Sequence, residues 1–132
     1  MSLVERRGAP RYRVDLPCQA ITNEGDVAEG RVKDLSLSGM QMQGDTRFVQ
    51  TLHPNFKRSN WRVPLKVSVR ISLPTTHQEV MNISLSCQLV YCNRKADDVY
   101  RVGCQYLDIP ADVQAALLDH IEHFGVPKHE AD

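Results

Sequence analysis

Apolar and polar residues alternate with a period of two over most of the sequence between residues 14 and 107. The clearest segment runs from Leu65 to Leu73, in which every second residue is apolar and the residues between them are Lys, Ser or Arg. Successive side chains of a strand point to opposite faces, so this pattern predicts a strand with one buried and one solvated face. The same period recurs in residues 14–20, 39–43, 83–91 and 100–106, and a shorter segment at residues 31–35 completes the count. We therefore expect about six strands.

Short polar clusters between these segments indicate how the strands connect. Residues 23–26, 74–77 and 93–98 have the composition and length of connections that join antiparallel neighbours. The chain leaves no room for helices between the strands, and a small sheet closes its edges best by curling into a barrel. The expected fold class is all-β, with six antiparallel strands that form a barrel.

One helix is expected after the last strand. From Val113 to Phe124 the apolar residues recur at spacings of three and four, which is the period of an amphipathic helix. We expect Asp108 or Asp112 to cap its N-terminus and Gly125 to end it. The apolar side of this helix is expected to pack on the barrel.

The composition sets the size of the domain and its surroundings. The chain has 132 residues, of which 42% are hydrophobic, so it fits one domain with a core. No run approaches the ~20 apolar residues of a membrane-spanning helix. The first residues also lack the apolar centre of a secretory signal. We therefore expect a cytoplasmic protein without membrane insertion, whose four cysteines are reduced.

The sequence lacks the usual signatures of catalysis and of metal binding. It contains no Gly-x-Ser-x-Gly elbow, no phosphate-binding Gly-x-x-x-x-Gly-Lys loop and no His-Glu-x-x-His pair. Cys87 and Cys92 are five residues apart, and strict alternation along a strand would turn them to opposite faces. His120 and His123 are three apart on the expected helix, but His120 lies on its apolar stripe. We expect neither an enzyme nor a metal site.

The formal net charge of +0 hides an asymmetry between the start of the chain and the rest. Residues 1–13 contain four arginines and one glutamate, four minus one, or +3. The remainder has twelve basic and fifteen acidic residues, or −3. The guanidinium group presents a rigid fork of donors, which suits phosphates and the edges of bases. A basic arm therefore precedes an acidic body.

Two short motifs combine residue types that suit a guanine nucleotide. Arg7 and Arg11 lie on the arm, and Asp34, Ser36 and Gly39 lie where one expected strand turns into the next. An arginine can donate to O6 and N7 of guanine, and a carboxylate can accept from its N1–H and exocyclic amine. A serine hydroxyl can donate to phosphate, and a glycine lets a ligand approach the backbone. The bland alternative for the second motif is an ordinary turn between strands.

Taken together, the two motifs resemble those of the PilZ domain family, bacterial receptors for cyclic di-GMP. The first is Arg-Arg-x-x-x-Arg, at Arg6, Arg7 and Arg11, and the second is Asp-x-Ser-x-x-Gly, from Asp34 to Gly39. Residues 100–106 resemble the last barrel strand of that family. The resemblance implies a PilZ-type barrel, with cyclic di-GMP as the ligand and no cofactor. It implies a site made of the residues of both motifs, with two further candidates; in order these are Arg6, Arg7, Arg11, Asp34, Ser36 and Gly39, then Arg13 and Ser38.

The resemblance also implies an organisation and a mechanism. Residues 1–13 would form a flexible arm, residues 14–124 the barrel and helix, and residues 125–132 a tail. Binding of the nucleotide would order the arm and change the surface shown to a protein partner, which the sequence does not identify. Roles in motility and biofilm formation are expectations from the family alone.

Two other functions stay open. A nucleic-acid-binding barrel would need a stacking platform and a basic groove, but only 6% of the residues are aromatic and the body is acidic, so no nucleic-acid partner is expected. The other alternative is an interaction adaptor on the same fold that binds no nucleotide.

Residues 45–63 do not fit the alternating pattern. A short helical turn is expected over residues 47–52. The aromatic residues Phe48, Phe56 and Trp61 would cover one mouth of the barrel or anchor a partner.

Overall fold

The computed structural model of the protein describes residues 10–53, 65–76 and 79–127. Four residues on which predictions were made, Arg6, Arg7, Phe56 and Trp61, lie outside these ranges.

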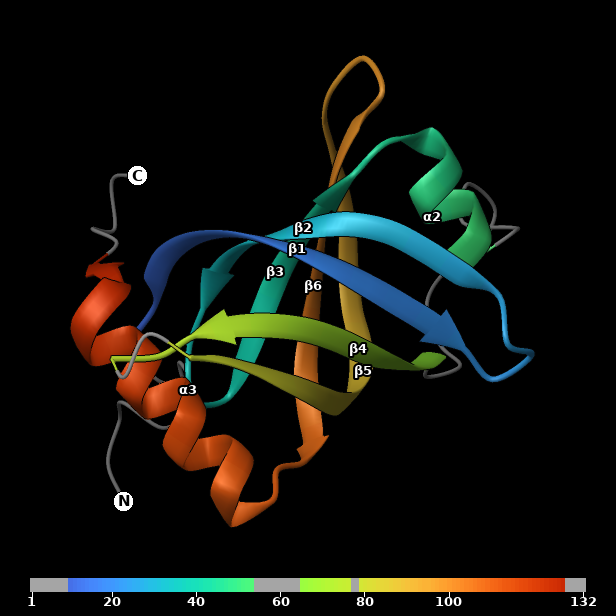
Figure 1. The fold of residues 1–132 in the computed structure, drawn as a ribbon. Helices are drawn as coiled ribbons and strands as arrows, with labels where there is room; N and C mark the ends of the chain where they lie inside the picture. The colour runs from blue at the N-terminus through green and yellow to red at the C-terminus, as the bar shows by residue number, and fades with distance from the viewer. Residues whose placement is uncertain (1–9, 54–64, 77–78, 128–132) are drawn as a thin grey trace, which may run out of the picture.

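Six long antiparallel strands form a closed barrel (Figure 1). They are β1 (Tyr12–Thr22), β2 (Val27–Leu35), β3 (Gly39–Gly44), β4 (Leu65–Pro74), β5 (Val80–Ala96) and β6 (Val99–Asp108). Hydrogen bonds connect them in the order β2-β3-β6-β5-β4-β1, and the pairing of β1 with β2 closes the ring. A two-residue strand, β7 (Val126–Pro127), adds to the start of β1. The prediction of a six-stranded antiparallel barrel is confirmed.

The alternation along the strands produces the core. In β4, for example, Val67, Val69, Ile71 and Leu73 are buried, whereas Lys66, Arg70 and Ser72 are exposed. Their apolar faces meet inside the barrel, and burial of apolar area is the main term that stabilises it.

Two helices lie at opposite ends of the barrel (Figure 1). The C-terminal helix α3 (Ala111–Phe124) buries the face that carries Val113, Leu117 and Ile121, as its spacing predicted. The short helix α2 (Thr46–Leu52) confirms the helical turn expected near residues 47–52. Neither helix within the described ranges has the length and apolar character needed to cross a membrane.

Among the residues that the structure describes, Phe48 of α2 is the largest fully buried side chain. Its ring lies against Gly30 and Gly44, at positions where a β-carbon on either glycine would collide with the ring. Asp45 caps the helix, because its carboxylate accepts a hydrogen bond of 2.8 Å from the backbone N–H of Phe48. One of the three aromatic residues of the 45–63 segment therefore belongs to the core.

The predicted cap of α3 is wrong. The N-cap residue is Pro110, which has no side-chain hydrogen bond to offer, and neither Asp108 nor Asp112 caps the helix. Asp112 lies one residue inside α3, where its negative charge still favours the positive end of the helix dipole. The C-terminal end is as expected, since the N–H of Gly125 donates to the carbonyl of Ile121 at 3.1 Å.

The connection predicted at residues 93–98 is shorter than expected. β5 continues to Ala96 and β6 starts at Val99, which leaves only Asp97 and Asp98 in the turn. Asp98 adopts φ 60°, a left-handed conformation that aspartate tolerates in turns. Because this hairpin projects beyond the barrel (Figure 1), both of its faces are solvated and the strands need no apolar residues.

The prediction that Cys87 and Cys92 face opposite sides of the strand is wrong, because a β-bulge lies between them. The register of β5 on β6 shifts between Leu89 and Tyr91, so Tyr91 pairs with Gly103 on the outer face. Cys92 then turns inward and packs against the core, as Cys87 does two residues before the bulge. The two cysteines therefore share a side instead of facing apart. Within the described ranges, no three His, Cys, Asp or Glu residues form a group suited to a metal ion.

Replacing Phe48 by alanine is expected to leave a cavity between α2 and β2. We expect the Phe48→Ala variant to lose about 3–5 kcal/mol of unfolding free energy in a urea titration. Val80→Ala is the control, because Val80 is 61% exposed and its loss should change the value by less than ~0.5 kcal/mol. Equal stability of the two variants would contradict the core role of Phe48.

Candidate functional site

A second β-bulge turns Asp34 to the outside of the barrel. On β2, Val32 pairs with Met42 and faces the core, whereas Asp34 pairs with Gln41, so Lys33 is an extra residue in this strand. Directly paired residues of neighbouring strands share a face of the sheet. Without the extra residue, the alternation would place Asp34 inside the barrel with Val32. The bulge therefore directs the carboxylate of Asp34 away from the apolar core.

Arg11 covers this carboxylate. Its Nη1 atom donates to Oδ1 of Asp34 at 2.8 Å, and the two side chains are 43% and 2% exposed. The two residues are 23 positions apart in the sequence. A carboxylate that is withdrawn from water needs a compensating charge or hydrogen bonds, and Arg11 supplies both. The structure thus brings Arg11 of the first motif into contact with Asp34 of the second.

Ser36 organises the turn between β2 and β3. Its Oγ accepts hydrogen bonds from the backbone N–H groups of Ser38 and Gly39, each at 3.1 Å, and lies 3.1 Å from the carbonyl oxygen of Gly39. The side chain is buried within the turn, whereas Ser38 is exposed. This arrangement makes Ser36 a positioning residue of the turn. The expectation that its hydroxyl donates to a phosphate stays a prediction.

Gly39 permits a close contact between β3 and β6. A β-carbon at this position would collide with the carbonyl oxygen of Cys104 on the neighbouring strand. Any side chain here would push the turn away from the barrel. The packing requirement for glycine is thus additional to the access to ligand that the motif predicted.

Tyr106 of β6 anchors the same turn from the other side. Its hydroxyl donates to the carbonyl of Ser36 at 3.0 Å, and its N–H donates to the carbonyl of Ser38 at 3.1 Å. Burial is the main cause that raises the pKa of Tyr106, so the hydroxyl stays protonated and remains a donor. Nothing in the sequence motifs indicated this residue, because it lies 70 positions from Ser36.

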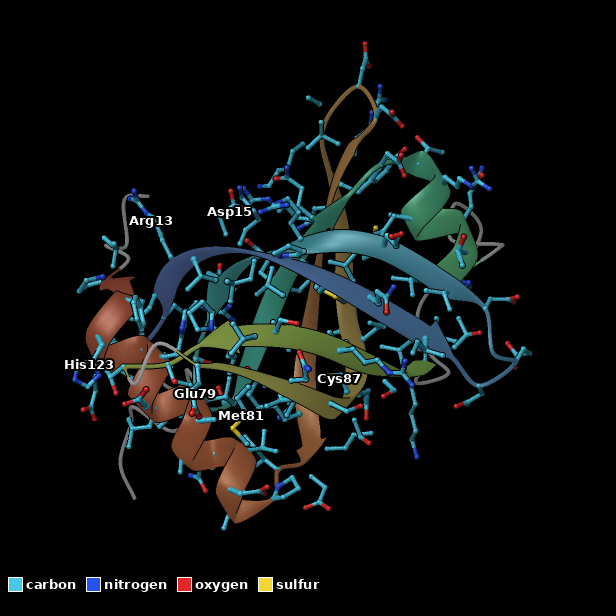
Figure 2. The ribbon with its side chains drawn as sticks, viewed as in Figure 1. Arg13, Asp15, Glu79, Met81, Cys87 and His123 are labelled. Carbon is cyan, nitrogen blue, oxygen red and sulfur yellow. The ribbon has the colours of Figure 1, made fainter. Side chains whose placement is uncertain are left out.

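A groove of about 630 Å³ on the outer face of the barrel borders Asp34. Five strands contribute to it, and its lining contains four cationic side chains and a single carboxylate; the residues are Arg13, Val14, Lys33, Asp34, Gln41, Lys95 and Arg101. Of the two further candidates from the sequence, Arg13 lies in this groove and Ser38 does not. Figure 2 shows Arg13 and Asp15 along β1.

The sequence analysis missed the cations Lys33, Lys95 and Arg101. They come from β2, β5 and β6, and only the pairing of these strands brings them to one groove. Lys33 shares Asp15 with Arg31, at 3.4 Å and 2.5 Å respectively, and the hydrogen bond from Arg31 lowers the pKa of Asp15. Because four cationic side chains face one carboxylate in its lining, the groove is positively charged, although the chain as a whole is neutral.

The barrel, the terminal helix and the cationic groove beside the Arg11–Asp34 pair define a small β-barrel protein with a surface suited to an anionic ligand. The model of the PilZ domain matches residues 5–123, and the chain belongs to this family. PilZ domains typically bind cyclic di-GMP and are generally not catalytic. The resemblance noted in the sequence is confirmed.

Solved structures with the same fold include the following three. The Bacillus subtilis inhibitor of motility, MotI/DgrA, has a TM-score of 0.65 and 16% identity, over 86% of this chain and 48% of that one. The PilZ domain of YcgR from Escherichia coli, solved with c-di-GMP, has a TM-score of 0.61 and 17% identity, over 87% and 88%. MrkH of K. pneumonia, in complex with c-di-GMP, has a TM-score of 0.59 and 20% identity, over 87% and 50%.

This chain spans about half the length of the B. subtilis and K. pneumonia proteins. At these identities the comparison establishes the fold. A search of curated protein sequences found no match.

Removing the hydroxyl of Tyr106 tests its role as an anchor. The Tyr106→Phe variant leaves the carbonyl of Ser36 without this donor, so we expect a loss of about 1–2 kcal/mol in unfolding free energy. Amide hydrogen exchange of Ser38 and Gly39 should become faster than in the unchanged protein. The control is Leu107→Ala on the same strand, where the side chain is 44% exposed. Unchanged exchange in the turn of Tyr106→Phe would contradict the anchoring role.

Proposed function

We propose that this protein is a cyclic di-GMP receptor that acts through a protein partner. The site consists of the two motifs, one on the arm and one at the turn between β2 and β3, namely Arg6, Arg7, Arg11, Asp34, Ser36 and Gly39. The observation that carries the proposal is the contact of Arg11 with the buried Asp34 at the edge of a cationic groove.

Asp34 is suited to read guanine. A carboxylate accepts from the N1–H and the exocyclic amine of guanine together. Burial of the carboxylate strengthens such hydrogen bonds, because the local dielectric constant is low. Asp34 is held in place before a ligand arrives, so little side-chain entropy is lost on binding.

The cations match the charge of the ligand. Cyclic di-GMP carries two phosphodiester groups, one negative charge each. The side chain of Arg11 is 43% exposed, so its remaining donors face solvent beside the groove. Arg6 and Arg7 would bring two further guanidinium groups to the same anion as the arm closes.

Closure of the arm would change the surface where β1 pairs with β7, next to the end of α3. Tyr12 pairs with Leu35 on one side and with Pro127 of β7 on the other. The root of the arm therefore lies between the site strand and the segment that follows α3. An arm ordered by the ligand would present a new surface at β1 and β7 to a partner, through differential contacts with the two states. The B. subtilis protein of this fold is an inhibitor of motility, which makes control of motility a candidate output.

A second candidate is an adaptor of the same fold that binds no nucleotide. One observation favours it: Arg11 satisfies Asp34, and Ser36 completes its own turn, without any ligand. In that case the two motifs would have structural roles only. A direct titration separates the two candidates.

The test is a calorimetric titration of the full chain with cyclic di-GMP. We expect saturable binding, and a loss of affinity of about 10- to 100-fold or more in Arg7→Ala and in Asp34→Ala, because each removes a charge-assisted hydrogen bond. Arg70→Ala is the matched control, since this exposed arginine lies on β4 outside the cationic groove and should not affect affinity.

Two controls test whether the binding is specific for guanine and whether each variant is folded. Cyclic di-AMP should not bind, because adenine lacks the N1–H and the 2-amino group of guanine that Asp34 would recognise. Thermal unfolding of each variant establishes that it is folded. If the folded unchanged protein does not bind cyclic di-GMP, the receptor function is wrong and the adaptor remains.

A further inference from the structure

Two glutamines of β3 hold Arg101 in a fixed orientation on the outer face of the barrel. Its Nε donates to Oε1 of Gln43 at 2.7 Å, and its Nη1 donates to Oε1 of Gln41 at 2.6 Å. Gln41 is itself fixed, because its Nε2 donates to the hydroxyl of Tyr91 at 2.6 Å. The network thus connects β5, β3 and β6.

Gly103 makes room for this network. Tyr91 and Gln41 both pair with Gly103, and a β-carbon there would collide with the ring of Tyr91. The aromatic ring can therefore lie against the strand with its hydroxyl directed to Gln41. The bulge after Leu89 is what brings Tyr91 to the outer face.

The groups that hold Arg101 are neutral amides. A half-buried guanidinium is commonly paired with a carboxylate, as Arg11 is with Asp34, but no ion pair of Arg101 occurs within the described part of the chain. The amide oxygens fix its position and leave its positive charge uncompensated. Neither hydrogen bond uses Nη2, so donors remain for an incoming anion.

Arg101 lines the same groove as Asp34. Asp34 pairs with Gln41 on β3, and Arg101 pairs with Gln43 on the next strand, β6. The backbones of β2 and β6 are therefore two strand spacings apart, ~10 Å, and the side chain of Arg101 reaches back to Gln41, which pairs with Asp34. Lys33 and Lys95 add positive charge to the groove. A ligand with a guanine at Asp34 would carry a phosphate toward Arg101.

We propose that Arg101 binds a phosphodiester group of the cyclic dinucleotide. Gln41 and Gln43 are positioning residues, which hold the guanidinium as neutral acceptors. This inference rests on the proposed function for the identity of the ligand. The preset fork of Arg101 offers two donors in one plane to two phosphate oxygens. A lysine in its place would supply the charge without the fork.

The sharpest test is the variant Gln43→Glu. It keeps the shape of the side chain and an oxygen that accepts from Nε of Arg101, but adds a negative charge that neutralises the guanidinium. We expect the melting temperature to stay the same or to rise, and the affinity for cyclic di-GMP to fall at least 10-fold. Gln19→Glu on β1 adds the same charge outside the cationic groove and should leave the affinity within about 2-fold.

Arg101→Gln is the second variant, and it should lower the affinity at least 10-fold with a weaker dependence on salt. If the unchanged protein binds cyclic di-GMP and both variants bind it equally well, the role of Arg101 is overturned and the receptor function stands. If the unchanged protein does not bind cyclic di-GMP, inorganic pyrophosphate is the probe. A shift of the Arg101 Nε–H resonance with pyrophosphate supports the phosphate site independently, and an unmoved resonance overturns it.

Discussion

The register of β2 between β1 and β3 is the constraint on which the site depends. Val32 and Leu35 both face the core, and the two residues between them, Lys33 and Asp34, contribute to the groove. A regular strand would place one of the two inside, and a carboxylate in this barrel would meet mainly apolar side chains at a cost of several kcal/mol. The bulge avoids that cost and gives the outer face its acidic group.

The rest of the site follows from the position of Asp34. Arg11 compensates its charge, and the turn that follows is closed by Ser36 and pinned by Tyr106. Gly39 then allows β3 to start in close contact with β6. The motif Asp-x-Ser-x-x-Gly therefore describes a folded corner of the barrel as well as a set of groups that could face a ligand.

Most of the fold could be predicted because the alternation of residues is a local property. Most of the long strands and the helix α3 were expected from the spacing of apolar residues. The errors arose where a bulge interrupts the period, as at Tyr91, or where a turn is shorter than its polar segment, as near Asp97. A bulge adds one residue to a strand and has no distinctive composition. A prediction from the sequence therefore continues the alternation through the bulge and assigns the residues after it to the wrong face. The spacing of three between Val32 and Leu35 was the one visible sign of the bulge in β2.

The candidate site was predictable only in part. Arg11 and Asp34 belong to motifs that a single sequence displays, whereas Lys33, Lys95 and Arg101 meet through the pairing of strands far apart in the chain. The same holds for Tyr106, whose contact with Ser36 spans 70 residues. Register is set by the whole barrel, and no local pattern encodes which outward cations share a groove.

Arg11 and Arg101 are both arginines held by oxygen acceptors, but the charge of the acceptor differs between them. Arg11, held by a carboxylate, contributes to the stability of the buried Asp34, while its own side chain stays partly exposed. Arg101, held by two amides, keeps its charge and its orientation for another anion. The first arrangement ties the root of the arm to the barrel, and the second leaves a fixed cation on the barrel wall. An anion that bridges the two would therefore connect the arm to a rigid surface, which is the arrangement that a switch driven by an ordered arm requires.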